Sequence, residues 1–281
     1  MHTHPKNVNS VSDSRNPLGK EVPHSPRYNP GHLYPVPRLE GRQEIGLGET
    51  LPFRGADTWN AYEISWLNGK GRPEVAIGRF HFPCETLNLI ESKSLKLYLN
   101  SFNLERFDSG AAVRSTIQTD LSSAAGGQVA VSLTPANRFS ATAIGSPPGH
   151  CLDTLDIETR DFRVDPETLA ATGEQVEETV FSNLLRTNCP VTGQPDWGTV
   201  VVSYRGQRID PEGLLKYIVS YREHTGFHEN CVERIFTDIA RQCAPDRLFV
   251  QAQFTRRGGL DINPWRANYE AAPNLSRYAR Q

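Results

Sequence analysis

The sequence contains no apolar run long enough to cross a membrane. Its 281 residues are 37% hydrophobic and 22% charged, and no stretch approaches the ~20 consecutive apolar residues that a transmembrane helix needs. The N-terminus also lacks the apolar core of a secretory signal peptide. We therefore expect a globular protein of average composition in the cytoplasm, without a membrane partner.

Neither sign of charge is in excess. The chain has 30 Lys and Arg against 32 Asp and Glu, a formal net charge of -2. This balance predicts no broad polyanion-binding surface, and hence no direct nucleic-acid partner. No Gly-x-Gly-x-x-Gly or phosphate-loop motif stands at a strand-helix junction, which argues against a Rossmann domain.

Paired cysteine motifs are also missing. The five cysteines are an odd number with no Cys-x-x-Cys spacing, so we interpret them as reduced thiols of a cytoplasmic protein. His81 and Cys84 stand three residues apart, as do His228 and Cys231, and two such pairs could in principle make a zinc site. The second pair straddles an expected helix start, so we expect no metal.

The most informative segment runs from Asn188 to Gly198 and contains Cys189 and Asp196. Its prolines and glycines predict a stiff loop rather than a helix or central strand. An expected strand, Thr199–Tyr204, follows at once. A thiol and a carboxyl at the mouth of a sheet suit a thiolate nucleophile with a proton carrier. The alternative is a buried structural cysteine beside a turn-forming aspartate.

A second segment, Glu91–Tyr98, begins an expected helix with an acid, two hydroxyls and two lysines. Ser92 is the expected N-cap residue. The free N–H groups of such a helix start, with the lysines, suit a phosphate-bearing ligand. Glu91 could instead accept two N–H bonds from a heterocyclic base. An exposed, charged helix start remains the plain alternative.

Two further segments combine polar groups of interest. Phe227-His228-Glu229 places an imidazole beside a carboxylate at a helix start, where His228 is a candidate general acid or simply a loop histidine. Arg256–Pro264 reads as a basic, glycine-bearing loop after a strand. Arginine forks and glycine backbones suit phosphate, although a solvated turn has the same composition.

The chain divides into three parts. Residues 1–40 are rich in Pro, Asn, Ser and His and predict an extended or partly disordered arm. Residues 41–170 and 171–281 show a similar order of strands and helices, which indicates a weak internal duplication or chance similarity of amphipathic helices. The expected strands are Tyr62–Leu67, Glu74–Phe82, 128–133, 155–164, Thr199–Tyr204 and 248–254, with a turn at 68–71, and the expected helices are 91–102, 111–124, 211–224 and 229–243.

Together these segments resemble the NADPH-dependent 7-cyano-7-deazaguanine reductases, the nitrile reductases of queuosine biosynthesis, in their long two-module form. The resemblance covers about Leu47 to Arg280. Its most specific element is the run Glu91–Tyr98, which matches the family signature of Glu, Ser, Lys, Ser, an apolar residue, Lys and a final aromatic. The other three segments also stand where the family pattern requires them.

The resemblance implies an α+β fold of two tandem tunnelling-fold (T-fold) modules, each an antiparallel sheet backed by helices. It implies that Glu91 comes from one module and Cys189 from the other, so one site needs both halves. Because members of the family join sheets side by side, it also implies a homodimer.

The implied reaction, a step in queuosine tRNA modification, reduces the nitrile of 7-cyano-7-deazaguanine to a primary amine with two molecules of NADPH. Cys189 would form a thioimide with the nitrile carbon, and Asp196 would carry the proton. His228 would be a donor or positioner in the second reduction step. No metal is required, because thiol addition activates the nitrile.

The resemblance also assigns the binding residues. The substrate would contact Ile90, Glu91, Ser92, Phe227, His228 and Glu229, with the two glutamates holding the deazaguanine edge. NADPH would be bound by Ser92, Lys93, Arg257 and Gly258. Two other functions stay open: a zinc-dependent purine-ring hydrolase of the GTP cyclohydrolase type, and a pterin- or purine-binding module without turnover.

Overall fold

The computed structural model describes residues 27–141, 143–159 and 161–281. The part of the predicted arm before residue 27 lies outside the described residues. In the part that is described, no helix is long and apolar enough to cross a membrane.

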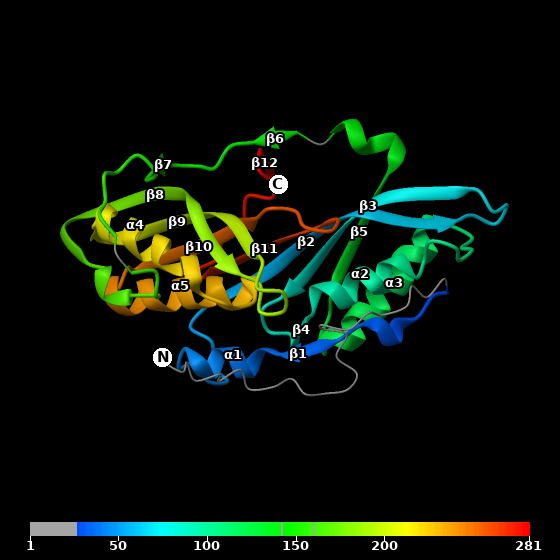
Figure 1. The fold of residues 1–281 in the computed structure, drawn as a ribbon, viewed down its shortest axis with the longest axis horizontal. Helices are drawn as coiled ribbons and strands as arrows, with labels where there is room; N and C mark the ends of the chain where they lie inside the picture. The colour runs from blue at the N-terminus through cyan, green and yellow to red at the C-terminus, as the bar shows by residue number, and fades with distance from the viewer. Residues whose placement is uncertain (1–26, 142, 160) are drawn as a thin grey trace, which may run out of the picture.

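One eight-stranded sheet runs through the molecule (Figure 1). Every neighbouring pair is antiparallel except the short parallel pair at one edge. Because antiparallel strands and helices combine in one body, the α+β prediction is confirmed. In spatial order the strands are β5 (Ala130–Pro135), β3 (Pro73–Pro83), β2 (Arg54–Leu67), β11 (Leu260–Ala267), β10 (Arg247–Phe254), β9 (Pro195–Ile209), β8 (Ala171–Asn188) and β7 (His150–Cys151).

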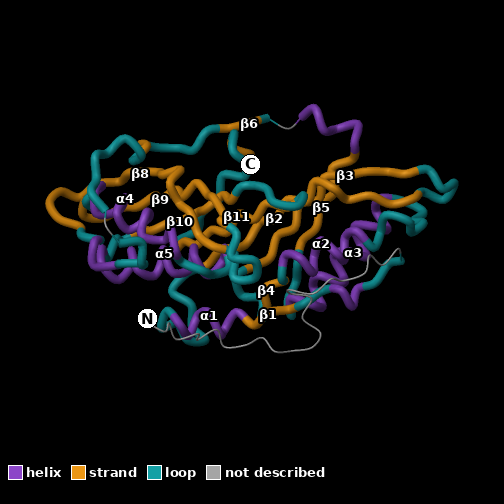
Figure 2. Tube along the Cα trace, in the orientation of Figure 1, coloured by secondary structure: helices purple, strands orange, loops and turns teal. Residues whose placement is uncertain are grey.

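Two pairs of helices lie along one side of this sheet, one pair over each half (Figure 2). The first pair is α2 (Ser92–Asn100) and α3 (Gly110–Ala125); the second is α4 (Pro211–Ser220) and α5 (His228–Cys243). The order β2-β3-α2-α3-β5 in the first half is matched by β8-β9-α4-α5-β10 in the second. Since β11 pairs with β2, the two halves form one continuous sheet.

The helices form where the apolar spacing predicts them. In α3, Val113, Ile117 and Leu121 recur every four residues and are fully buried against the sheet. Ser109 caps its start by accepting a hydrogen bond from the Ala112 amide. Gly126 ends it in the left-handed conformation, with φ 65°. The helices expected over 91–102, 111–124 and 229–243 are thus confirmed, and the one over 211–224 continues beyond α4 as a 3-10 turn, Tyr221–Glu223.

One expected strand is wrong. The described residues of 155–164 form no strand. Their alternation of apolar and polar residues has another cause, because Leu155, Ile157 and Val164 pack one side of an irregular loop against the core. The neighbouring position at the sheet edge is taken by β7, which pairs with Val180 and Phe181.

Two long strands were not predicted. The first half of β8 is polar because it lies near the sheet edge, and its residues Gly173–Gln175 are exposed. The strand β11 is buried throughout but contains Pro264, which argues against a central strand. Residues 260–264 therefore belong to β11 and not to the basic loop that the composition indicated.

The described end of the arm packs against the body instead of extending away from it (Figure 1). A 3-10 turn, Pro30–His32, leads into β1 (Pro35–Pro37), which pairs antiparallel with β4 (Asn88–Ile90). The helix α1 (Arg38–Glu44) follows. The remaining short elements are two 3-10 turns, Ala136–Ala141 and Pro166–Thr168, and a small parallel pair of β6 (Ile144–Gly145) with β12 (Arg277–Tyr278).

Candidate active site

The turn between β8 and β9 holds the thiol and the carboxyl close together. Asn188 is the last residue of β8, and Asp196 is the second residue of β9, where it pairs with Thr187. The Cys189 amide donates to the Gln194 carbonyl at 2.9 Å. The prediction that the whole segment is a loop is therefore wrong at its end, because hairpin pairing extends β9 back to Pro195.

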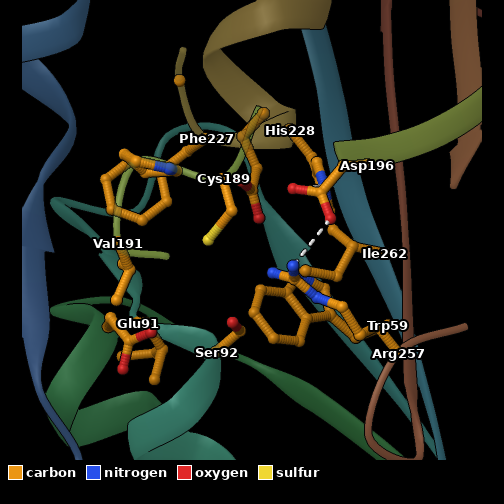
Figure 3. Close-up of a pocket in the computed structure, with 14 residues that line it drawn as sticks. Trp59, Glu91, Ser92, Cys189, Val191, Asp196, Phe227, His228, Arg257 and Ile262 are labelled. Carbon is orange, nitrogen blue, oxygen red and sulfur yellow. Dashed lines mark ion pairs between the residues drawn. The ribbon is translucent and has the colours of Figure 1, made fainter. Parts of the chain in front are cut away.

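The Cys189 side chain points into a pocket (Figure 3). Only 7% of the residue is exposed. Burial raises the pKa of the thiol. Hydrogen bonds from the Thr192 hydroxyl, the backbone of Thr192 and Val191, and Arg257 lower the pKa by more than burial raises it. The net pKa therefore lies below that of an ordinary cysteine. A lowered pKa increases the thiolate fraction, which is the nucleophilic form.

Asp196 lies between two basic side chains. Its Oδ2 is 3.2 Å from Nε2 of His228, and its Oδ1 is 3.4 Å from Nη1 of Arg257 (Figure 3). The imidazole stacks on Phe254 with the ring centres 3.8 Å apart. This stacking fixes the ring beside the carboxyl, although Nε2 is not aligned with any described acceptor for a hydrogen bond. Such loose contacts are common before substrate binds.

Glu91 begins α2, and it is the N-cap residue in place of Ser92. Its carboxylate accepts hydrogen bonds from the amides of Lys93 and Ser94, at 2.9 and 2.7 Å. Two of the N–H groups that were expected to meet a phosphate are thus already bonded. The carboxylate retains further lone pairs for a ligand, since it can accept about four hydrogen bonds.

Glu229 lies in the first turn of α5 and is 3% exposed. Burial raises its pKa to about 8, and the negative charge of Asp57 adds to the rise, while Arg38 and Arg266 oppose it. A pKa raised in this way favours the protonated carboxyl, which can donate one hydrogen bond.

These groups line a single pocket. It takes residues from both halves of the chain, as the position of Glu91 opposite Cys189 illustrates (Figure 3). The predicted residues in its lining are Ile90, Glu91, Ser92, Cys189, Asp196, Phe227, His228, Glu229 and Arg257. Lys93 and Gly258, the other two predicted residues, are outside the lining.

Gly258 lies beside α2. Its backbone has φ 59°, which favours glycine, and a Cβ at this position would stand 3.0 Å from Nζ of Lys96. Burial lowers the pKa of Lys96, and the neighbouring Arg257 lowers it further. Lys96 is one of the two lysines of the run Glu91–Tyr98 that suit a phosphate-bearing ligand, but it is not among the residues that the resemblance assigned to NADPH. Lys96 and Arg257 thus place two basic side chains near the backbone of Gly258.

Several apolar lining residues were also missed, namely Trp59, Pro190, Val191, Gly226 and Ile262. Trp59 and Ile262 pair across β2 and β11, so their position depends on a strand pairing that no local signal predicts. Concerning metals, the described residues contain no group of three or more His, Cys, Asp or Glu side chains able to hold an ion.

Residues 24–133 match the family model described as nitrile reductase, 7-cyano-7-deazaguanine-reductase N-term, and residues 195–273 match the model described as QueF-like protein. A curated relative named NADPH-dependent 7-cyano-7-deazaguanine reductase, from Desulfotalea psychrophila, is 56% identical over 94% of this chain and 97% of its own.

Two other relatives carry the same name. The protein from Bordetella parapertussis is 50% identical over 96% of this chain and 100% of its own, and that from an Azoarcus species is 55% identical over 90% of each chain. A crystal structure described as the archaeosine synthase QueF-Like in the apo form aligns with a TM-score of 0.31 and 17% identity, covering 36% of this chain and 99% of its own. On the near full-length identity to the curated relatives, this chain belongs to the family of NADPH-dependent 7-cyano-7-deazaguanine reductases.

Proposed function

We propose that this protein reduces the nitrile of 7-cyano-7-deazaguanine to 7-aminomethyl-7-deazaguanine with NADPH, a step of queuosine biosynthesis. The observation that carries the proposal is the convergence of Cys189, Asp196, Glu91 and Glu229 on one pocket, in a chain 56% identical to a reductase of that name. Each side chain supplies a group that nitrile reduction needs.

Cys189 is the proposed nucleophile. Its sulfur attacks the nitrile carbon, so that a carbon–sulfur bond forms while one π bond of the nitrile breaks and its electron pair moves to nitrogen. The product is a thioimide, which accepts hydride more readily than the nitrile does. The lowered pKa of the thiol supports this role, because it increases the thiolate available for attack.

Asp196 is the proposed proton carrier, with His228 beside it. The carboxyl takes the thiol proton and delivers it to the nitrile nitrogen as charge develops there. Arg257 and His228 lie within 3.4 Å of its two oxygens, which holds the carboxyl toward the pocket. His228 is placed to return a proton to Asp196 when nitrogen takes another in the second reduction.

The two glutamates are proposed to bind the deazaguanine. Its pyrimidine edge presents N–H donors, for which the remaining lone pairs of Glu91 are suitable acceptors. The acid form of Glu229 would donate to a ring acceptor, and its carboxylate form would accept from an N–H group. Phe227 would stack on the ring, while Ile90 and Ser92 complete the walls. Buried groups of this kind reject analogues that leave them unpaired.

NADPH would be held by Ser92, Lys93, Arg257 and Gly258, with Lys96 added. The cationic side chains near the left-handed backbone of Gly258 fit a cofactor that carries an extra ribose phosphate. When bound, the cofactor would supply the hydride for each of the two reduction steps. Between these steps the carbon–sulfur bond breaks, so that Cys189 leaves as thiolate and an imine remains for the second reduction. The protein's part is to orient the thioimide carbon toward it and to exclude water.

We also propose the finer architecture that the family implies. Residues 41–170 and 171–281 would be tandem T-fold modules, an assignment supported by the repeated element order of the two halves. The protein would act as a cytoplasmic homodimer that joins sheets side by side. Size-exclusion chromatography with light scattering tests the dimer.

The direct test of the function is a spectrophotometric assay. NADPH absorbance should fall only when 7-cyano-7-deazaguanine is present, with two NADPH consumed for each amine formed. Cys189→Ala should remove this activity while leaving the folded state intact by circular dichroism. Sustained turnover by the folded Ala variant would contradict the proposed mechanism, and absence of nitrile-dependent oxidation by the wild type would contradict the function.

A further inference from the structure

The arm segment Tyr34–Arg38 contacts the backbone of Glu91 and, through Arg38, the charged groups that act on Glu229. It precedes the proposed N-terminal module and contributes no residue to the pocket lining. Its strand β1 pairs with β4, directly before Glu91, and its Arg38 starts α1, which packs on α5. The same short segment therefore reaches the starts of α2 and α5.

On the Glu91 side the contacts form a closed set of hydrogen bonds. The Glu91 amide donates to the Tyr34 carbonyl at 2.9 Å, and the Tyr34 amide donates to Oγ of Ser94 at 3.0 Å. The Ser94 hydroxyl in turn donates to the Glu91 carbonyl at 2.6 Å. The backbone at Glu91 is thus fixed by the arm, while its carboxylate caps α2.

On the Glu229 side the contact is electrostatic. Arg38 is 3% exposed, and its Nη2 donates to Oδ2 of Asp57 at 2.6 Å, while its Nε donates to the Thr86 hydroxyl at 3.1 Å. Asp57 also accepts from Arg266 at 2.8 Å. Arg38 and Asp57 act on Glu229 with opposite sign, since Asp57 opposes ionisation of its carboxyl and Arg38 favours it.

One nitrogen of the Arg38 guanidinium makes no hydrogen bond to the described residues. Nη1 of Arg38 is buried and has no hydrogen-bond partner among the described residues. A buried guanidinium N–H without an acceptor is costly and calls for an explanation. Asp57 is already shared between two arginines, so it cannot readily serve as a further acceptor. Arg38 also acts on two other acids, Glu233 and Glu229. Glu233 already accepts hydrogen bonds from Arg42 and Arg266. This leaves Glu229, the acid at the pocket, as the acceptor for Nη1.

We propose that residues 34–38 form a positioning segment for substrate recognition, in which the backbone of Tyr34 sets Glu91 and the free Nη1 of Arg38 holds the Glu229 carboxylate once substrate is bound. This inference rests on the proposed function. Arg38 acts through Glu229 and does not touch the substrate. The described arm then serves the chain's own pocket, which the sequence alone could not indicate.

Arg38→Met is the test variant, and Arg42→Met is its matched control. Arg42 lies one turn later in α1, is 7% exposed, and pairs at 2.7 Å with Glu233, an acid outside the pocket lining. Both substitutions break a buried ion pair, so both should lower the melting temperature. Only Arg38→Met should weaken binding of 7-cyano-7-deazaguanine, raising its Kd by about tenfold or more. The KM for NADPH should change by less than about twofold in both variants.

A double-mutant cycle separates positioning from general damage. If Arg38 acts through Glu229, then adding Arg38→Met to Glu229→Gln should weaken substrate binding by less than about twofold beyond Glu229→Gln alone. Full additivity, or equal substrate affinity in the Arg38→Met and Arg42→Met proteins, would overturn the inference. Activity of the wild type decides the proposed function independently of either result.

Should Arg38→Met fail to fold, Arg38→Lys provides the second measurement. Lysine keeps the charge next to Asp57 but has a single ammonium in place of the fork, so it cannot bond both acids in the same geometry. A folded Lys variant should still lose substrate affinity relative to Arg42→Lys. Unchanged affinity would contradict the role of Nη1.

Discussion

The starts of α2 and α5 each place a glutamate in the lining of one pocket, yet the two carboxyls have different surroundings. Glu91 is an N-cap residue whose carboxylate accepts two backbone N–H bonds. Glu229 is the second residue of α5, whose N-cap residue, Phe227, provides no side-chain hydrogen bond. Both glutamates are almost fully buried, at 1% and 3% exposure, so the difference arises from their partners.

The comparison shows which electrostatic effect dominates. A helix start favours a negative charge by about 0.3–1 kcal/mol, whereas burial can shift a carboxyl pKa by several units. At Glu229 burial prevails, and the pKa rises to about 8. A pocket with one carboxyl that caps a helix and one whose raised pKa favours the protonated form can hold a ligand edge that presents both donors and acceptors.

The largest expected effect is on catalysis. Glu91→Ala and Glu229→Ala should each lower kcat/KM for the nitrile by roughly 30- to 1000-fold, because each leaves buried substrate groups without a partner. Glu212 occupies the first turn of α4 and is exposed, so Glu212→Ala is the control and should keep wild-type kinetics. Wild-type kcat/KM in either pocket variant would remove that glutamate from the binding site.

The second effect is on how stability depends on pH. The folded protein holds the Glu229 proton up to about pH 8, while the unfolded chain releases it near 4.5. Between these values the free energy of unfolding should therefore fall as pH rises, relative to Glu229→Gln, and the difference should level off above about pH 8. Urea unfolding across this range measures it. A free energy of unfolding that rises with pH in the wild type, relative to Glu229→Gln, would contradict the raised pKa of Glu229.

The third effect is on stability and arises from the N-cap hydrogen bonds of Glu91 at the start of α2. Glu91→Ala removes two hydrogen bonds to the start of α2 and should lower the free energy of unfolding by about 1–2 kcal/mol. Glu229→Ala should cost less than this at pH 8, since it also removes an unfavourable buried acid. Equal losses measured by urea denaturation would mean that capping does not distinguish the two glutamates.

The smallest effect concerns the thiol of Cys189, which lines the same pocket as the two glutamates. Thr192→Val removes a hydroxyl that lowers the pKa of Cys189, so the midpoint pH of its alkylation by iodoacetamide should rise by up to about one unit. Thr192→Ser keeps the hydroxyl and should retain the wild-type midpoint. The exposed Cys151, whose pKa is raised, serves as an internal reference. An unchanged midpoint in Thr192→Val would exclude the proposed stabilisation of the thiolate.

Much of the fold follows from local patterns in the sequence. The spacing in α3 and α5, the turn at Asn68–Gly71 between β2 and β3, and the apolar strand β10 were all predictable. The strand β8 was missed because the first part is polar, and β11 was missed because of Pro264. Both depend on pairing with distant strands, which determines burial independently of local composition.

The site was predictable where residue types carry chemistry. Of the residues assigned by resemblance, all but Lys93 and Gly258 line one pocket. The capping role of Glu91 was missed, since Ser92 is the more usual N-cap residue type. The contribution of Arg38 depends on a contact with Asp57, nineteen residues away, and no local signal marks such a contact.

The central claim is that the sulfur of Cys189 bonds to the nitrile carbon before reduction. Mass spectrometry of the protein mixed with 7-cyano-7-deazaguanine, without NADPH, tests this most directly. We expect a mass gain equal to the whole ligand, localised to the peptide that contains Cys189 and absent from Cys189→Ser. An unmodified Cys189 peptide in a preparation that turns over the nitrile, or an adduct on another cysteine, would contradict the account.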